Sequence, residues 1–202
     1  MMNMLQKVLT VCCLLVTLPV LAQQPQRSAV EAAEAGVREL LQTVSESQSL
    51  FSNNREEYFE RIEQVLDRFV DFNAVAEVVM SRYASQATGE QTQRFADILK
   101  NTLTRFYGAA LVSYDDQELV FLPPRNESSD PRADTVVGME LRGGDNGVIR
   151  FQYQMFLNED NEWKLKNLSL GGINLGRQYF TQFAAAMSSH NNDIDQVLDN
   201  WQ

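Results

Sequence analysis

Few side chains in this sequence could carry out catalysis, and their spacing favours structural roles. His190 is the only histidine, so a metal site built on several histidines is excluded, and a Ser-His-Asp triad would depend on this one residue. It lies in the polar stretch 188–192, which is typical of a solvated link between helices. Acidic pairs such as Glu56–Glu57 and Asp115–Asp116 fall at expected helix starts or turns, where carboxylates stabilise helix N-termini. We therefore expect no catalytic residues and no enzyme activity.

Other motifs that could bind a cofactor or a metal are better explained by turns or by export. The glycine-rich stretch 143–147 joins two alternating segments and lacks the lysine of a phosphate loop, so it predicts a hairpin turn. Cys12 and Cys13 are the two cysteines, and both lie in the N-terminal segment that we expect to be removed. Their removal excludes disulfides, thiolate catalysis and cysteine metal sites. We expect neither a cofactor nor a metal.

Apolar side chains at regular spacing are the main signal. From Ile149 to Leu157 they alternate with polar residues, which is the period of a half-buried strand. Turn formers at 158–161 and a second alternating run from Trp163 predict an antiparallel hairpin. After Gly171–Gly172, an amphipathic helix is indicated by a stripe of Leu175, Tyr179, Phe183 and Met187. Hairpin and helix together present a broad apolar surface that something must cover.

Helices are predicted before the strands, and further helices after them. Helical periodicity and capping residues predict helices over 28–50, 55–69, 72–80, 91–111 and 191–201. Thr88 followed by Gln91 has the pattern of a capping box ahead of the long helix. Alternation predicts strands at 118–122 and 135–142 in front of the hairpin. Helices, a four-stranded meander and closing helices make an α+β order rather than a βαβ one.

The N-terminus has the pattern of a secretion signal. A short segment with Lys7 precedes the apolar run 8–21, and Val20-Leu21-Ala22 has the small residues of a signal-peptidase site. The run is shorter than the ~20 residues of a spanning helix, so a cleaved signal peptide over 1–22 is favoured over a membrane anchor. Residues 23–202 are enough for a single domain. Losing Lys7 takes the net charge from −10 to −11, which disfavours nucleic acid and anionic membranes as resident partners.

Several short motifs along the chain are only moderately specific one by one. Their order and spacing together are a more specific signal. The motifs are Phe69-Val70-Asp71-Phe72, Val79-Met80-Ser81-Arg82-Tyr83, the stretch 87–95, Leu103-Thr104-Arg105-Phe106-Tyr107, Trp163-Lys164-Leu165 and the stretch 172–183. In these motifs the chain resembles the MlaC family, the soluble periplasmic phospholipid carriers of the maintenance-of-lipid-asymmetry system, also called the toluene-tolerance auxiliary family. The chain departs from the family at Ala84, where Trp is usual, at Asn167, often Asp, and at Gln178-Tyr179-Phe180, where the family has Asn-Tyr-Arg.

This resemblance implies both a fold and a function. The implied fold is a curved antiparallel sheet of about four strands, surrounded by helices and enclosing an apolar cavity for acyl chains. The implied protein is a monomeric, non-enzymatic periplasmic carrier, with phospholipid as its cargo. It would shuttle lipid between an inner-membrane ABC transporter complex, with its substrate-binding MCE-type protein, and an outer-membrane lipoprotein complex. The result would be maintenance of outer-membrane lipid asymmetry.

The cavity lining expected from the stripes and the resemblance together is Val79, Tyr83, Phe95, Leu99, Leu103, Phe106, Tyr107, Met139, Ile149, Phe151, Tyr153, Met155, Leu165, Leu175, Tyr179 and Phe183. Periodicity alone does not distinguish a full core from a hollow one, because Met and Phe fill irregular interiors well. One alternative is therefore a periplasmic protein-interaction module with a solid core and no lipid cargo. Another is a hydrolase on a related α+β scaffold, which would need His190 or a buried carboxylate.

Overall fold

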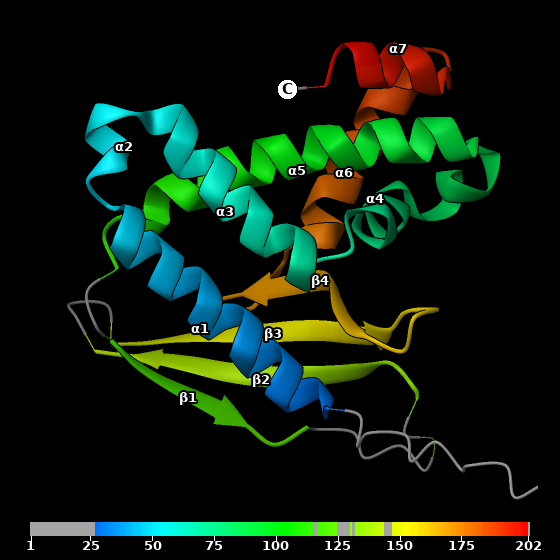
Figure 1. Ribbon diagram of the computed structural model, residues 1–202. Helices are drawn as coiled ribbons and strands as arrows, with labels where there is room; N and C mark the ends of the chain where they lie inside the picture. The colour runs from blue at the N-terminus through cyan, green and yellow to red at the C-terminus, as the bar shows by residue number, and fades with distance from the viewer. Residues whose placement is uncertain (1–26, 115–116, 125–129, 131, 144–146, 202) are drawn as a thin grey trace, which may run out of the picture.

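The computed structural model describes residues 27–114, 117–124, 130, 132–143 and 147–201, and they form an α+β fold (Figure 1). An antiparallel sheet lies on one side and helices cover it and extend away from it. The predicted signal peptide, both cysteines and Asp115–Asp116 fall outside the described residues. None of the helices in these ranges is long and apolar enough to cross a membrane.

Capping side chains determine where most helices begin. The helices are α1 (Ala29–Ser47), α2 (Leu50–Asn53), α3 (Arg55–Phe69), α4 (Phe72–Met80), the 3-10 helix η1 (Ser81–Gln86), α5 (Gly89–Leu111), α6 (Leu175–Ser189) and α7 (Ile194–Asp199). Ahead of α5, the Thr88 hydroxyl accepts from the Gln91 N–H at 3.1 Å, and the Gln91 side chain accepts from the Thr88 N–H at 3.0 Å. The predicted capping box is therefore confirmed.

The strands follow one another in the sheet in chain order. They are β1 (Glu118–Leu122), β2 (Thr135–Arg142), β3 (Val148–Leu157), β4 (Trp163–Leu170) and β5 (Ile173–Asn174), all antiparallel to their neighbours. The register places Met139 opposite Phe151, and Phe151 opposite Leu170. A bulge at Gln154/Met155 shifts the pairing of β3 with β4. Directly paired residues lie on the same face, so the register assigns each side chain to a face of the sheet.

The buried residues form three clusters rather than one. The first lies among α4, α5, α6 and α7, and the second lies between α1, Phe69 and the sheet. The third joins α1 to α3 around Tyr58 and Ile62. Helix α1 crosses the sheet, and α5 lies farther from it, where α6 passes it on its way from the sheet to α7 (Figure 1). The sheet is thus covered mainly by α1.

The predicted α+β order is confirmed, and the predicted elements need few corrections. The sheet gains a fifth strand, β5, which at two residues is too short to produce a periodic signal. The helix predicted over 28–50 ends at Ser47, and the short α2 follows it. The helix predicted over 191–201 was too long. Asn191 and Asn192 have φ of 54° and 61°, and Asp193 caps a helix that starts at Ile194.

Candidate functional site

One half of the inner sheet face, the face toward α1, is closed. Val137, Tyr153, Met155 and Leu165 are buried there against Ala33 and Val37 of α1 and against Phe69. The ring centroids of Phe69 and Tyr153 are 6.2 Å apart. The Tyr153 hydroxyl has a sulfur partner, Met139 Sδ at 3.7 Å, and burial raises the pKa of Tyr153. This half is an ordinary packed core that leaves no space for a guest.

The other half of the same face is apolar but incompletely covered. Toward the end of the sheet at Arg142 and Val148, most apolar side chains on this face are only half-buried, although Met139 among them is buried: Leu119, Phe121, Leu141, Ile149, Phe151, Leu168 and Leu170. Ile173 continues the row beside Leu170 and is 58% exposed. Packed interiors bury such side chains. The sheet therefore changes along its strands from a sealed core to an apolar surface that is accessible to a ligand.

A pocket of about 700 Å³ adjoins this apolar surface. Its walls are the C-terminal half of α1, the segment after α5 and the start of β1: Arg38, Leu41, Gln42, Val44, Ser45, Glu46, Gln48, Val112, Ser113, Tyr114 and Leu119. Leu41 and Leu119 also pack against the cluster on the inner sheet face, so the pocket is continuous with that face. Its volume lies in the ~300–1,000 Å³ range of small-molecule sites.

The chemistry of this pocket suits an amphiphile. Leu41, Val44, Val112 and Leu119 supply apolar walls, whereas polar and charged side chains such as Arg38, Gln42 and Glu46 surround them. Such an arrangement can bind a hydrocarbon chain against the apolar walls and a polar group at the edge of the pocket. We call the half-buried inner sheet face together with this pocket the apolar site.

The predicted lining residues lie in two separate places. Met139, Phe151, Tyr153, Met155 and Leu165 belong to the sheet cluster, and Ile149 lies on its half-buried side. The residues Val79, Tyr83, Phe95, Leu99, Leu103, Tyr179 and Phe183 belong to the helical cluster. There the Phe95 ring lies 5.1 Å from Phe183 and 5.0 Å from Trp201. Leu175 is half-buried at the start of α6. The structure thus places the predicted lining residues in two separate clusters, whereas the sequence analysis assigned them to one cavity.

Phe106 corrects one prediction, because it was expected to face inward and is 68% exposed. The packed helical cluster includes Phe95 and Leu99 in the first half of α5, and Gly108 in its second half faces Phe59. The apolar stripe of α5 therefore extends past the part of this helix that other helices cover. Its neighbour Tyr107 is half-buried, and burial together with adjacent Tyr179 raises the pKa of Tyr107 to about 12.

Several residues of the pocket were missing from the predicted set, namely Leu41, Val44, Val112 and Leu119. Leu41 and Val44 lie on the apolar stripe of the helix predicted over 28–50. Its period shows which side of α1 is buried without showing that this side meets a sheet. Val112 follows the predicted helix 91–111 and has no periodic signal, whereas Leu119 lies in the predicted strand 118–122, whose alternation does not show that it borders a pocket.

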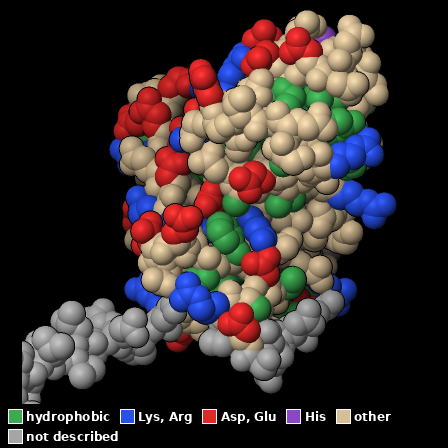
Figure 2. Space-filling model, turned by 90° about the vertical axis from the view of Figure 1, so that its right-hand side faces the viewer, with side chains coloured by type: hydrophobic (Ala, Val, Ile, Leu, Met, Phe, Trp, Pro, Cys, Tyr) green, Lys and Arg blue, Asp and Glu red, His purple; other side chains and the backbone are tan. Residues whose placement is uncertain are grey.

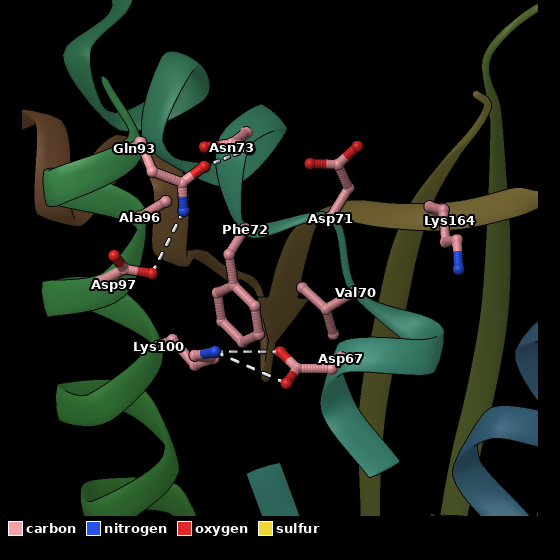
Figure 3. A pocket seen from close by; sticks show the side chains of 10 residues that line it. All are labelled: Asp67, Val70, Asp71, Phe72, Asn73, Gln93, Ala96, Asp97, Lys100 and Lys164. Carbon is pink, nitrogen blue, oxygen red and sulfur yellow. Dashed lines mark hydrogen bonds and ion pairs between the residues drawn. The ribbon is translucent and has the colours of Figure 1, made fainter. Parts of the chain in front are cut away.

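A second pocket, of about 270 Å³, is polar and internally paired (Figure 3). Lys100 lies 3.3 Å from Asp67. Gln93 accepts from Asn73 at 3.0 Å and donates to Asp97 at 3.2 Å. Asp71 accepts from the Ala74 N–H as the cap of α4, and in the described part of the chain no cluster of His, Cys, Asp or Glu is suited to a metal ion. These contacts assign the pocket a structural role where α3, α4 and α5 meet.

The structure shows the surroundings of each residue that departs from the family pattern. Asn167 accepts from the N–H groups of Leu168 and Gly176 at 2.9 and 3.0 Å, and its amide donates to Gln154 and Asn174. An aspartate could not make the two donated bonds. Ala84 packs against the helical cluster, Gln178 is exposed, and the ring of Phe180 has the Arg82 guanidinium above it at 5.5 Å.

The fold is similar to that of a solved phospholipid-binding protein. The phospholipid-binding protein from Ralstonia solanacearum, solved in complex with a phospholipid, superposes with a TM-score of 0.76 and 25% identity, over 86% of this chain and 94% of that one. The toluene tolerance protein ttg2D of Pseudomonas putida is 31% identical over 185 residues, which are 91% of this chain and 82% of that protein. The family model described as MlaC protein matches residues 34–202. The chain belongs to the MlaC family.

Proposed function

We propose that this protein is a non-enzymatic periplasmic carrier that binds the acyl chains of a phospholipid in the apolar site. The observation that carries the proposal is the uneven covering of the inner sheet face, from buried Tyr153 and Met155 to half-buried Phe151 and Ile149, with a 700 Å³ pocket beside it. A sheet made only to support a core would be sealed along its whole length. Membership of the MlaC family and the lipid complex of the Ralstonia solanacearum protein support the same function.

The size of the hydrophobic effect explains why a carrier needs such a site. Exposing an acyl chain of ~16 carbons to water costs about 0.8 kcal/mol per CH₂, or ~12 kcal/mol per chain. A hydrated groove would leave most of that cost uncompensated. Side chains such as Leu41, Leu119 and Phe151 offer the chain an apolar environment, while the polar edge of the pocket leaves a head group in contact with water.

The proposed setting is the periplasm, where a carrier must move between two membranes. In this proposal a signal peptide over 1–22 exports the chain. The monomer then exchanges phospholipid with an inner-membrane ABC transporter complex, through its MCE-type protein, and with an outer-membrane lipoprotein complex, and so maintains outer-membrane lipid asymmetry. The net charge of −10 favours release from anionic membrane surfaces.

Native mass spectrometry of protein purified without detergent tests lipid binding directly. Wild-type protein should carry phospholipid. Leu119→Trp fills the pocket beside the sheet, and Leu41→Trp fills it from α1. Both variants should lose most of the co-purified lipid and should keep the wild-type melting temperature, because the added ring enters space that is not occupied by the protein.

Two further variants make this test specific. Val148→Trp adds the same ring on the opposite face of the sheet, at a residue that is 47% exposed, and should change neither lipid content nor stability. Met155→Trp overfills the closed half of the inner face and should destabilise the fold by ~1–3 kcal/mol. Wild-type protein without lipid, or a Leu119→Trp variant with full lipid, would reject the proposed site and favour the interaction module with a solid core.

A further inference from the structure

Arg82 and Arg177 lie near aromatic side chains at the start of α6. Arg82 of η1 lies over two rings, 5.0 Å from the centroid of Tyr83 and 5.5 Å from that of Phe180, and it donates to the Tyr83 hydroxyl at 3.0 Å. Arg177 lies one helical turn before Phe180 on α6, so their side chains share one face of that helix. We call Arg82, Tyr83, Arg177 and Phe180 the basic surface.

The two arginines of the basic surface lack the carboxylate partners found elsewhere. Among the described residues, Arg94 pairs with Asp199, Arg105 with Glu56, and Arg142 and Arg150 both pair with Glu140. Within the same part of the chain, no carboxylate forms an ion pair with Arg82 or Arg177. In a protein of net charge −10, two arginines without ion-pair partners among the described residues make this surface locally basic.

The position of Arg177 makes this arrangement unfavourable for the isolated fold. It lies in the first turn of α6, which contains no acidic residue, and the positive end of a helix dipole disfavours a cation. Local rules of stability are most often broken where a protein binds something. Figure 2 shows acidic and basic side chains mixed over much of this face, with basic side chains next to hydrophobic ones at its right-hand edge.

We propose that the basic surface is the docking site for a partner protein that presents carboxylates around an apolar side chain. Arginine and tyrosine are enriched at the energetic centres of protein interfaces. The Arg82 guanidinium is already held by two rings and a hydroxyl, so little side-chain entropy remains to be lost on binding. Phe180 and Tyr83, both half-buried, provide the apolar contact between the charges.

A protein partner fits these observations better than an anionic membrane. A membrane surface would attract two arginines but repel the remaining net negative charge of the molecule. An acidic protein surface meets only the basic surface at close range, and its repulsion from the rest of the carrier would fix the orientation of docking. The basic surface shares no residue with the pocket beside β1, so a docked partner would leave that pocket accessible.

The experiment measures binding of the carrier to the periplasmic domains of its own organism's inner-membrane and outer-membrane complexes, each immobilised separately. This choice of probe rests on the proposed function. Arg82→Glu/Arg177→Glu should weaken binding to at least one domain by at least about tenfold and should flatten its salt dependence. The matched control is Arg55→Glu/Arg61→Glu, which changes the net charge equally. Arg55 is a suitable match because it also lies over a ring, 4.4 Å from the centroid of Phe51. The control variant should bind each domain as the wild type does.

Three results would overturn the proposal. They are an unchanged affinity of the Arg82/Arg177 variant, an equal loss in the Arg55/Arg61 control, and wild-type protein that binds neither domain. Vesicles with anionic lipid form a separate arm, and a vesicle affinity that falls with the same variant would assign the surface to membranes instead. Circular dichroism confirms that each variant is folded. Native mass spectrometry of lipid content separates failure of docking from failure of lipid binding, because the docking variant should keep its lipid.

Discussion

The substitution Gly36→Ala tests how α1 is held on the sheet. A methyl group at position 36 would lie 2.4 Å from Cδ2 and 2.5 Å from Cγ of Phe69. Phe69 is buried, and its ring centroid lies 6.2 Å from that of Tyr153. Because the ring is confined on its far side, either α1 must move away from the sheet or the cluster must reorganise.

The expected change in stability combines two effects of opposite sign. Alanine in a helix interior is more stable than glycine by about 1 kcal/mol. The new contact is ~1 Å shorter than a favourable carbon–carbon separation of ~3.5–4.0 Å, which places the overpacking cost near the upper end of ~1–3 kcal/mol. The net result is a destabilisation of about 2 kcal/mol, and for a chain of this size the melting temperature should fall by ~4–8 °C.

Urea and thermal unfolding followed by circular dichroism measure this change. Gly89→Ala is the matched control, since it also adds a methyl group to a helix and meets no atom within 4 Å, and it should cost nothing. In a Phe69→Ala background, Gly36→Ala should stabilise the protein by about 1 kcal/mol, because only the helix propensity remains. A Gly36→Ala protein as stable as wild type would refute the close packing of α1 on Phe69.

Two further predictions concern the base of α6 and the buried tyrosines. Asn167→Ala removes bonds that join β4 to α6, β3 and β5 and should cost ~1–3 kcal/mol; Asn167→Asp, which keeps the accepted bonds, should cost less, and equal losses would show that the accepted bonds contribute nothing. Burial is the main cause that raises the pKa of both Tyr58 and Tyr107 to about 12. Their contribution to stability is therefore complete below the unfolded value of ~10 and is lost as the pH rises through 12. Absorbance at 295 nm should show tyrosines that resist ionisation near pH 10 until the protein unfolds, and simultaneous titration of all of them in folded protein would contradict this.

Local signals predicted the elements well because their causes are local. The cap of α5 depends on Thr88 and Gln91, three residues apart, and the strand Thr135–Arg142 has the predicted bounds because alternation and flanking turns define it. The start of α7 was misplaced because Asn191 and Asn192, which precede its first apolar residue Ile194, have a left-handed backbone that is not helical. An apolar period does not report the φ of the residues beside it.

Sequence patterns alone were enough to predict most of the helices, four of the five strands, the acidic character and the resemblance to the MlaC family. Tertiary structure alone decided that Phe95 and Phe183 pack together while Phe151 remains half-covered, and that Leu41 and Leu119 meet at a pocket. Periodicity specifies which side of an element is apolar, whereas the space left above that side depends on the length and placement of distant elements. Whether an apolar face becomes a core or a binding site is therefore settled by which helices cross it, as α1 does here.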